Sequence, residues 1–196
     1  PPRSTLFPYT TLFRSALERL PGQSLKGLVR SADEAAALIT DGMTVGTSGF
    51  TPSGYPKAVP KALAERYEGR ADKPRLTLIA GASVGDELDG ALARAGMIAR
   101  RYPYQTNEAC RDGINAGSIA FDDIHISHLP QRIDYGFFGP IDVAILEAAA
   151  LYDDGRLVPT TSVGISPTLA ANARSIIVEL NAAMPRELEG LHDIYR

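Results

Sequence analysis

Ser83 is the residue whose sequence context most directly suggests covalent chemistry. It is the centre of a Gly-x-Ser-x-Gly pattern, residues 81–85, between an apolar run and a helical pattern, and this strand–turn–helix setting is typical of a serine nucleophile. Asp142 or Asp153, followed by His192, would complete a triad in that chain order. Only one predicted strand precedes this strand–turn–helix unit, however, and no His-Gly-Gly-Gly segment supplies an oxyanion donor. We therefore favour a turn serine that hydrogen-bonds a small substrate.

A glycine-rich loop follows an earlier apolar run. Residues 46–56 read GTSGFTPSGYP; such glycines let a backbone approach a ligand closely, and the start of the following helix can face an anion. The loop matches neither the Gly-x-Gly-x-x-Gly nor the Gly-x-x-x-x-Gly-Lys-[Ser/Thr] nucleotide motif. Its composition alone is equally consistent with a ligand loop and with a simple tight turn.

A third loop groups hydroxyl and amide side chains after a predicted strand. Residues 102–107 read YPYQTN. Side chains of this kind orient a carboxylate or a carbonyl group rather than transfer protons. Capping of the next helix by Thr106 or Asn107 would explain the same residues.

We interpret the other chemically active side chains as structural. His125 and His128 are three residues apart, but on an extended segment they would face opposite sides, and no third ligand is evident, so no metal site is predicted. Glu147 and Glu179 end predicted strands and could act as carboxylate nucleophiles or bases, although residues at strand ends more often have structural partners. Cys110 is expected to be a small packed residue.

Composition limits the classes of partner. The chain has 196 residues, with 20 Lys+Arg against 23 Asp+Glu and a formal charge of −3. Hydrophobic residues make up 44% and charged residues 22%, as in an ordinary soluble domain. The acidic balance argues against nucleic acid and anionic membranes, and no apolar run approaches the roughly 20 residues that span a bilayer. A single cysteine cannot form an intramolecular disulfide, so we expect a reducing, cytoplasmic location.

Strand and helix patterns alternate along the chain, which predicts an α/β fold with an open, mainly parallel sheet flanked by helices. In such sheets ligands bind at the carboxyl ends of the strands, where the three loops begin. Strands are expected at residues 44–48, 75–80, 98–104, 141–147 and 175–180, the last two buried, with a hairpin over 151–160 and helices at 31–39, 57–67, 86–95, 107–116 and 167–173.

Residues 1–15, PPRSTLFPYTTLFRS, stand apart from this alternation. They contain a near-repeat and several prolines but no acidic residue, and they lack the apolar region and cleavage site of a signal peptide. We interpret them as a non-native or disordered extension and residues 16–196 as one domain.

Six segments between residues 31 and 195 carry a family resemblance: GTSGFTPSGYPKAVPKALA, LIAGASVGDELDGALA, RRYPYQTN, GFFGPIDVAILEAAA, GRLVPTTSVGISPT and IIVELN. Together they resemble the N-terminal half of the acetyl-CoA hydrolase/transferase family. These are class I CoA-transferases and include succinyl-CoA:acetate CoA-transferase. The segments are too long and too many for a chance match of one short motif. The resemblance implies an α/β fold of the NagB/RpiA/CoA-transferase-like type.

The resemblance also implies an enzyme that transfers CoA between acetyl- or succinyl-CoA and a carboxylate such as acetate or succinate, or that hydrolyses acetyl-CoA. In this family a glutamate attacks the thioester and becomes a glutamyl-CoA thioester. That glutamate lies in the C-terminal half and has no counterpart in residues 1–196. The chain is then a fragment, inactive alone, whose partner is the missing C-terminal domain of a homodimer. The CoA thioester is a substrate, and no permanently bound cofactor is expected.

For the site, the resemblance implies that Ser83 and Thr106 line the carboxylate and acyl groups and that the Gly49-Phe50 turn is a wall of the same cavity. Gln105 stands where a family member has Asn, a change that could alter the acceptor preference. No catalytic residue is expected in the chain. A serine hydrolase that uses Ser83 and a non-catalytic module that binds CoA or a carboxylate remain the alternatives.

Overall fold

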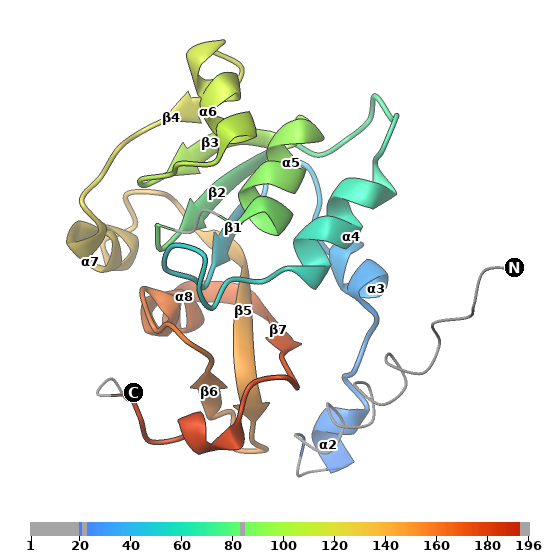
Figure 1. The fold of residues 1–196 in the computed structure, drawn as a ribbon, viewed down its shortest axis with the longest axis vertical. Coiled ribbons are helices and arrows are strands. Elements are labelled where there is room, and N and C mark those ends of the chain that lie inside the picture. The colour runs from blue at the N-terminus through green and yellow to red at the C-terminus, as the bar shows by residue number, and fades with distance from the viewer. Residues whose placement is uncertain (1–19, 21–22, 83–84, 193–196) are drawn as a thin grey trace, which may run out of the picture.

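A computed structural model gives the fold of the chain and describes residues 20, 23–82 and 85–192. Its strands are β1 (Thr44–Thr47), β2 (Leu76–Ala80), β3 (Ile98–Tyr102), β4 (Ala120–Phe121), β5 (Ile141–Leu151), β6 (Leu157–Pro159) and β7 (Ala173–Leu180). They form one sheet in the order β4-β3-β2-β1-β5-β6, with β7 paired to β5 (Figure 1). Every strand pair is parallel except β5–β6. The predicted mainly parallel α/β sheet is confirmed.

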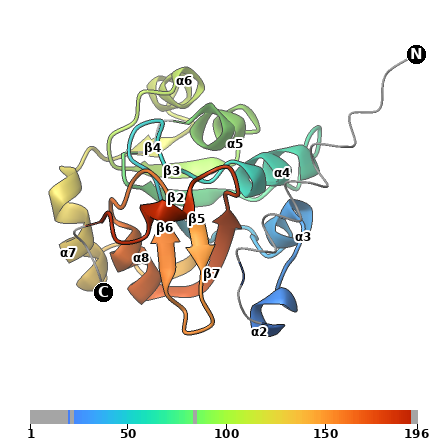
Figure 2. The same ribbon diagram turned by 60° about the horizontal axis from the view of Figure 1, so that its bottom comes forward.

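The α-helices are α2 (Gln23–Lys26), α3 (Ala32–Ala36), α4 (Ala58–Arg66), α5 (Ala91–Arg94), α6 (Glu108–Asn115), α7 (Leu129–Asp134) and α8 (Ser166–Asn172). Residues of α3, α4, α5 and α6 share one apolar core with Leu78, whereas residues of α7 and α8 share a second core with Ile79. Adjacent strand residues point to opposite faces, so the two cores lie on opposite sides of the sheet (Figure 2).

Local sequence signals explain how these elements begin and pack. Ser31 caps α3 through a reciprocal pair of bonds: its hydroxyl accepts from the Glu34 amide at 3.2 Å, and the Glu34 carboxylate accepts from the Ser31 amide at 2.8 Å. This capping box satisfies donors at the start of the helix. Gly46 lets α8 approach β1, because a Cβ at this position would lie only 2.4 Å from Cδ2 of Leu169.

The prediction that residues 175–180 form a buried strand is wrong. Among the described strands β7 pairs with β5 alone, so it lies at an edge of the sheet, and Ile176 is 46% exposed. An apolar run does not by itself separate an edge strand from a central one. β5 lies inside the sheet between β1 and β7 and is buried along nearly all its length. It turns back into β6 within the predicted hairpin.

Short helices of other types complete the described chain. They are the π-helix η1 (Asp86–Gly90) and the 3₁₀-helices η2 (Ile126–His128) and η3 (Arg186–Leu188). η1 and α5 together occupy the span predicted as one helix. Residues 1–15, interpreted above as an extension, lie outside the described residues. No helix in the described part of the chain has the length and apolarity needed to cross a membrane.

Candidate functional site at the carboxyl edge of the sheet

Three segments that follow parallel strands are joined in a row by hydrogen bonds. The amide of Thr51, in the loop after β1, donates to the carbonyl oxygen of Ala82, after β2, at 2.8 Å. Asn107, after β3, donates from Nδ2 to Oδ1 of Asp86 at 3.2 Å. The three loops singled out in the sequence are therefore neighbours at one edge of the sheet, where α/β proteins bind ligands.

Close packing of Gly85 on the ring of Tyr55 joins the first two loops. A Cβ at position 85 would lie 2.0 Å from Cε2 of Tyr55, so only glycine fits there. The Tyr55 hydroxyl donates to Oε2 of Glu87 at 2.6 Å. Burial of the ring and this bond raise the pKa of Tyr55 well above its usual range, and the same bond lowers the pKa of Glu87.

Ser48 and Glu147 hold the loop after β1 against β5. The Ser48 hydroxyl donates to the carbonyl oxygen of Gly54 at 2.8 Å and accepts from the amide of Glu147 at 2.9 Å. The buried carboxylate of Glu147 pairs with Nζ of Lys57 at 2.6 Å and accepts from the Thr160 hydroxyl at 2.8 Å. Both of its oxygens therefore have partners within the fold.

Glu179 caps α4 from the neighbouring strand β7. Its carboxylate accepts from three consecutive backbone amides: Lys57 at 2.8 Å, Ala58 at 3.0 Å and Val59 at 2.7 Å. Burial raises the pKa of Glu179, and the three backbone bonds oppose this shift only in part. The carboxylates of Glu147 and Glu179, considered above as nucleophiles or bases, thus both serve the structure of the site.

A buried ion pair lies beneath the loops after β2 and β3. Asp89 on η1 and Arg101 on β3 have fully buried side chains, and Nε of Arg101 lies 2.9 Å from Oδ1 of Asp89. Burial raises the pKa of Asp89, and the charge of Arg101 opposes this shift. Cys110 on α6 is also fully buried. Burial, with a smaller contribution from Asp89, raises the pKa of its thiol to about 11, so it is the packed residue that the sequence predicted.

The loop after β3 presents the predicted polar side chains. Asn107 caps α6 by accepting from the amide of Cys110 at 3.3 Å, which confirms the capping interpretation for this residue. Thr106 is exposed. Gln105 is partly buried, and its Oε1 atom is buried without a hydrogen-bond partner among the described residues. An unpaired amide oxygen can accept a hydrogen bond from a ligand.

Two other predicted site residues, Gly49 and Phe50, lie in the same row of loops. The carbonyl oxygen of Gly49 would lie 2.8 Å from a Cβ on Gly81, so glycine at position 81 permits this contact. Phe50 is 48% exposed, and its role as a cavity wall stays a prediction. Ser83 lies outside the described residues, so its place in this row stays a prediction.

Asp142, the first aspartate expected for a Ser83 triad, is bonded to residues away from this edge. Asp142 accepts from the amide of Thr44 at 2.9 Å and pairs with Arg174 at 2.9 Å. Thr44 and Asp142 lie near the starts of their parallel strands, so Asp142 lies at the opposite edge of the sheet from the three loops. Asp153 lies in the turn between β5 and β6. The position of Asp142 argues against it as the acid of such a triad.

The histidine pair lies at the 3₁₀-helix η2, which follows β4 along the chain. The expectation of an extended segment is wrong: His125 caps the 3₁₀-helix η2 and His128 ends it, which places their ring centroids 5.7 Å apart. His125 Nδ1 is bonded to the Ser127 side chain at 2.7 Å. Within the described ranges no group of three or more His, Cys, Asp or Glu residues is arranged to hold a metal ion.

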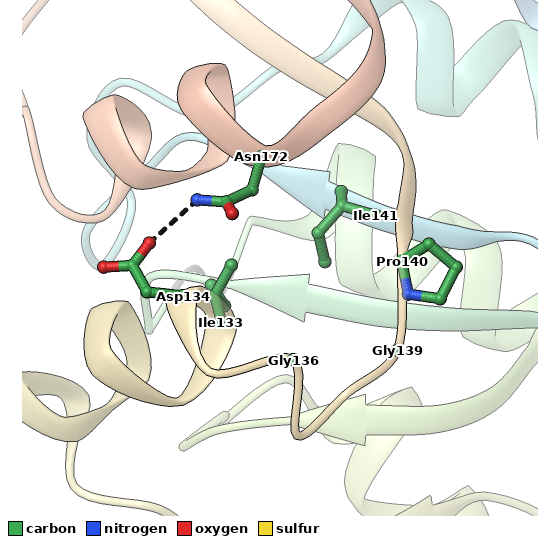
Figure 3. A pocket seen from close by; sticks show the side chains of 7 residues that line it. All are labelled: Ile133, Asp134, Gly136, Gly139, Pro140, Ile141 and Asn172. Atoms are coloured by element: carbon green, nitrogen blue, oxygen red, sulfur yellow. Dashed lines mark hydrogen bonds between the residues drawn. The ribbon is translucent and has the colours of Figure 1, made fainter.

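Two surface hollows flank the described fold. One, of about 360 Å³, lies at the amino end of β5, where the side chains of Asp134 and Asn172 hydrogen-bond at 2.9 Å (Figure 3). It is at the edge of the sheet opposite the loops. The other, of about 460 Å³, lies beside the loop after β6 and is lined by Thr160, Thr161, Ser162, Val163, Leu188, Leu191 and His192. The Ser162 hydroxyl donates to the carbonyl oxygen of Ser53 at 3.1 Å, so this hollow adjoins the row of loops.

Sequence reasoning missed the buried ion pair and the Lys57–Glu147 pair. One signal was available: Arg100 and Arg101 are adjacent in a predicted strand, so alternation had to turn one of them toward the core. A buried arginine requires a carboxylate partner, but nothing in the sequence identified Asp89 as that partner.

Comparison with known proteins places this geometry in a family. Residues 23–195 match the acetyl-CoA hydrolase/transferase N-terminal domain. The chain is 47% identical over 178 residues to the succinyl-CoA:acetate CoA-transferase of Clostridium kluyveri, an alignment that covers 91% of this chain and 33% of the relative. It is 42% identical over 188 residues to the acetyl-CoA hydrolase of Schizosaccharomyces pombe, with 87% and 36% covered.

The solved structure of glutaconate coenzyme A-transferase from Acidaminococcus fermentans has the same fold, with a TM-score of 0.58 at 16% identity over 76% of this chain and 68% of that one. The chain spans about a third of the length of the two curated relatives. It belongs to the acetyl-CoA hydrolase/transferase family, as the N-terminal domain of that family.

Proposed function

We propose that the chain, from residue 16 onward, forms the acyl- and carboxylate-binding wall of an enzyme that transfers CoA between acetyl- or succinyl-CoA and a small carboxylate, or that hydrolyses acetyl-CoA. The observation that supports this most strongly is the row of three hydrogen-bonded loops at the carboxyl edge of the sheet. The names of the relatives supply the reaction class.

The attacking carboxylate comes from the part of the protein beyond this chain. In the reaction a glutamate oxygen adds to the acyl thioester and CoA leaves as its thiolate; the thiolate then attacks the glutamyl carbonyl, which forms the glutamyl-CoA thioester and releases the first carboxylate. A nucleophile of this kind needs a carboxylate free to reach the substrate. Glu147 and Glu179, the buried glutamates at the site, are bonded to Lys57, Thr160 and the start of α4.

The loops provide hydrogen bonds and shape for the acyl and acceptor groups. The Ser83 and Thr106 hydroxyls bind the carboxylate oxygens, Gln105 adjusts the choice of acceptor, and Gly49 and Phe50 wall the cavity. Acetate and succinate are the acceptors this site is expected to take. The CoA thioester enters as a substrate, and the reaction uses no permanently bound cofactor.

The rest of the protein covers the open side of this domain. Of the described strands, β7 pairs with β5 alone, and Ile176 on β7 is 46% exposed. Exposed apolar side chains beside an open strand edge are suited to burial by a second domain. The complete enzyme is a cytoplasmic homodimer in this proposal, and the buried single cysteine fits a reducing compartment.

A chimera tests the proposal. Residues 23–195 replace the aligned N-terminal segment of the Clostridium kluyveri relative, and CoA transfer from succinyl-CoA to acetate is measured. We expect transfer by the chimera and none by the 196-residue chain alone. A folded chimera without transfer, made beside an active parent, would contradict the proposal. If such a chimera still bound CoA or acetate saturably, the chain would instead be a binding module.

A further inference from the structure

Two ties connect the loop after β3 to the π-helix η1, which follows the loop after β2. The inner tie is the buried pair: Arg101 donates from Nε to Oδ1 of Asp89 at 2.9 Å and from Nη2 to Oδ2 at 3.3 Å. Arg101 also donates from Nη1 to the carbonyl oxygen of Tyr102, the last residue before the loop. One planar guanidinium group therefore holds both η1 and the beginning of the loop.

The outer tie lies at the other end of the loop. Asn107 donates from Nδ2 to Oδ1 of Asp86, and Arg94 holds the same carboxylate with two bonds of 2.8 and 3.0 Å. Gly90 makes room for this arrangement, because a Cβ there would lie 2.1 Å from Oδ1 of Asp86 and 2.9 Å from Nδ2 of Asn107. The contact between Asp86 and Asn107 therefore depends on glycine at position 90.

Stability alone does not explain the inner tie. Two charges removed from water lose their hydration, and well-packed apolar side chains of similar volume often serve a core as well or better. What the ion pair adds is a fixed geometry, since the guanidinium group binds the carboxylate through two nitrogens and has a third for the backbone carbonyl. Gln105 and Thr106 lie between the two ties along the chain.

We propose that Asp89 and Arg101, together with Asp86 and Asn107, are positioning residues that fix the Gln105-Thr106 segment relative to η1. They touch no substrate themselves. One consequence of this proposal rests on the proposed function: correct placement of Thr106 sets the affinity for the carboxylate. The placement itself is a property of this chain.

Hydrogen exchange in the 196-residue chain tests the placement without any enzyme assay. The double variant Asp89→Leu/Arg101→Met replaces the ion pair by apolar side chains of similar volume, so the midpoint of thermal unfolding should change little. We expect faster amide exchange at residues 104–107 and unchanged exchange in β5. Unchanged exchange at residues 104–107 in a folded variant would overturn the proposal, whatever the activity.

The variant Asn107→Ser keeps the test decisive if the double variant does not fold. Serine preserves a helix cap but is too short to reach Asp86, so α6 should persist while residues 104–106 exchange faster. Exchange unchanged in this variant would likewise overturn the two-tie arrangement. Arg100→Gln/Asp122→Asn is the matched control, because it removes an exposed ion pair between Arg100 on the same strand β3 and Asp122, which follows β4. This control should leave these amides unaffected.

The chimera measures the consequence for catalysis. A misplacement of about 1 Å costs roughly a hundredfold in rate, so we expect about that loss in kcat/KM for Asp89→Leu/Arg101→Met, with a raised KM for acetate. The control pair should retain the parent values. Faster loop exchange with unchanged kinetics in an active chimera would contradict the positioning role. Faster loop exchange together with an inactive parent chimera would contradict the proposed function but leave the placement supported.

Discussion

Gly85→Ala should destabilise the fold by a predictable amount, because the new Cβ would lie 2.0, 2.2 and 2.5 Å from three atoms of the Tyr55 ring. The backbone is not the obstacle, since Gly85 has φ −77° and ψ 136°, which alanine adopts readily. The buried ring must move, and overpacking of this kind costs about 1–3 kcal/mol. The displaced hydroxyl also loses its bond to Glu87, worth about 1.5–3 kcal/mol for a charged partner.

We therefore expect a loss of about 2.5–6 kcal/mol in the free energy of unfolding, measured by urea denaturation of the 196-residue chain followed by circular dichroism. Tyr55→Phe is the control for the hydroxyl alone and should cost no more than the hydrogen-bond part. In a Tyr55→Ala background the ring is gone, so Gly85→Ala should cost less than about 1 kcal/mol. An equal cost of Gly85→Ala with and without the ring would refute the packing argument.

Three further predictions concern other parts of the molecule. Burial raises the pKa of Glu179 above 4.5 in the folded chain, so its contribution to stability is complete below the unfolded pKa and is lost as pH rises through the folded pKa. The free energy of unfolding of the wild type relative to Glu179→Gln should therefore fall as pH rises. A difference that rises with pH would contradict this prediction. Cys110, with a pKa of about 11 and no exposed surface, should react with a thiol reagent only as the chain unfolds in urea; rapid labelling of the native chain would show that α6 opens. In the chimera, Thr106→Val should raise the KM for acetate about 10- to 100-fold, the range for a lost hydrogen bond to a charged group; an unchanged KM would remove Thr106 from the site.

Elements set by local signals could be predicted from the sequence. The capping box at Ser31 and Glu34, the buried run of β5 and the Asp-Asp-Gly turn into β6 all formed where expected, because each depends on residues close together in the chain. The same holds for Asn107 as the cap of α6.

Features that depend on distant residues could not be predicted in the same way. The apolar pattern of β7 does not show whether a further strand pairs with it. A buried strand was therefore predicted, whereas β7 lies at an edge of the sheet. The pairs Asp89–Arg101 and Lys57–Glu147 join residues 12 and 90 positions apart, and composition gives no partner for a buried charge. Glu147 and Glu179 were identified as candidate nucleophiles or bases. Only the three-dimensional contacts show that the carboxylate of Glu179 is bonded to the start of α4 and that of Glu147 to Lys57.

The most direct test of the central claim is to locate the covalent intermediate. The chimera is mixed with succinyl-CoA, quenched in acid and digested, and the peptide that carries the CoA adduct is identified by mass spectrometry. We predict an adduct on a glutamate of the grafted C-terminal part and none on residues 23–195. CoA or an acyl group found on Glu147, Glu179 or Ser83 would contradict the account, because the attacking group would then belong to this chain.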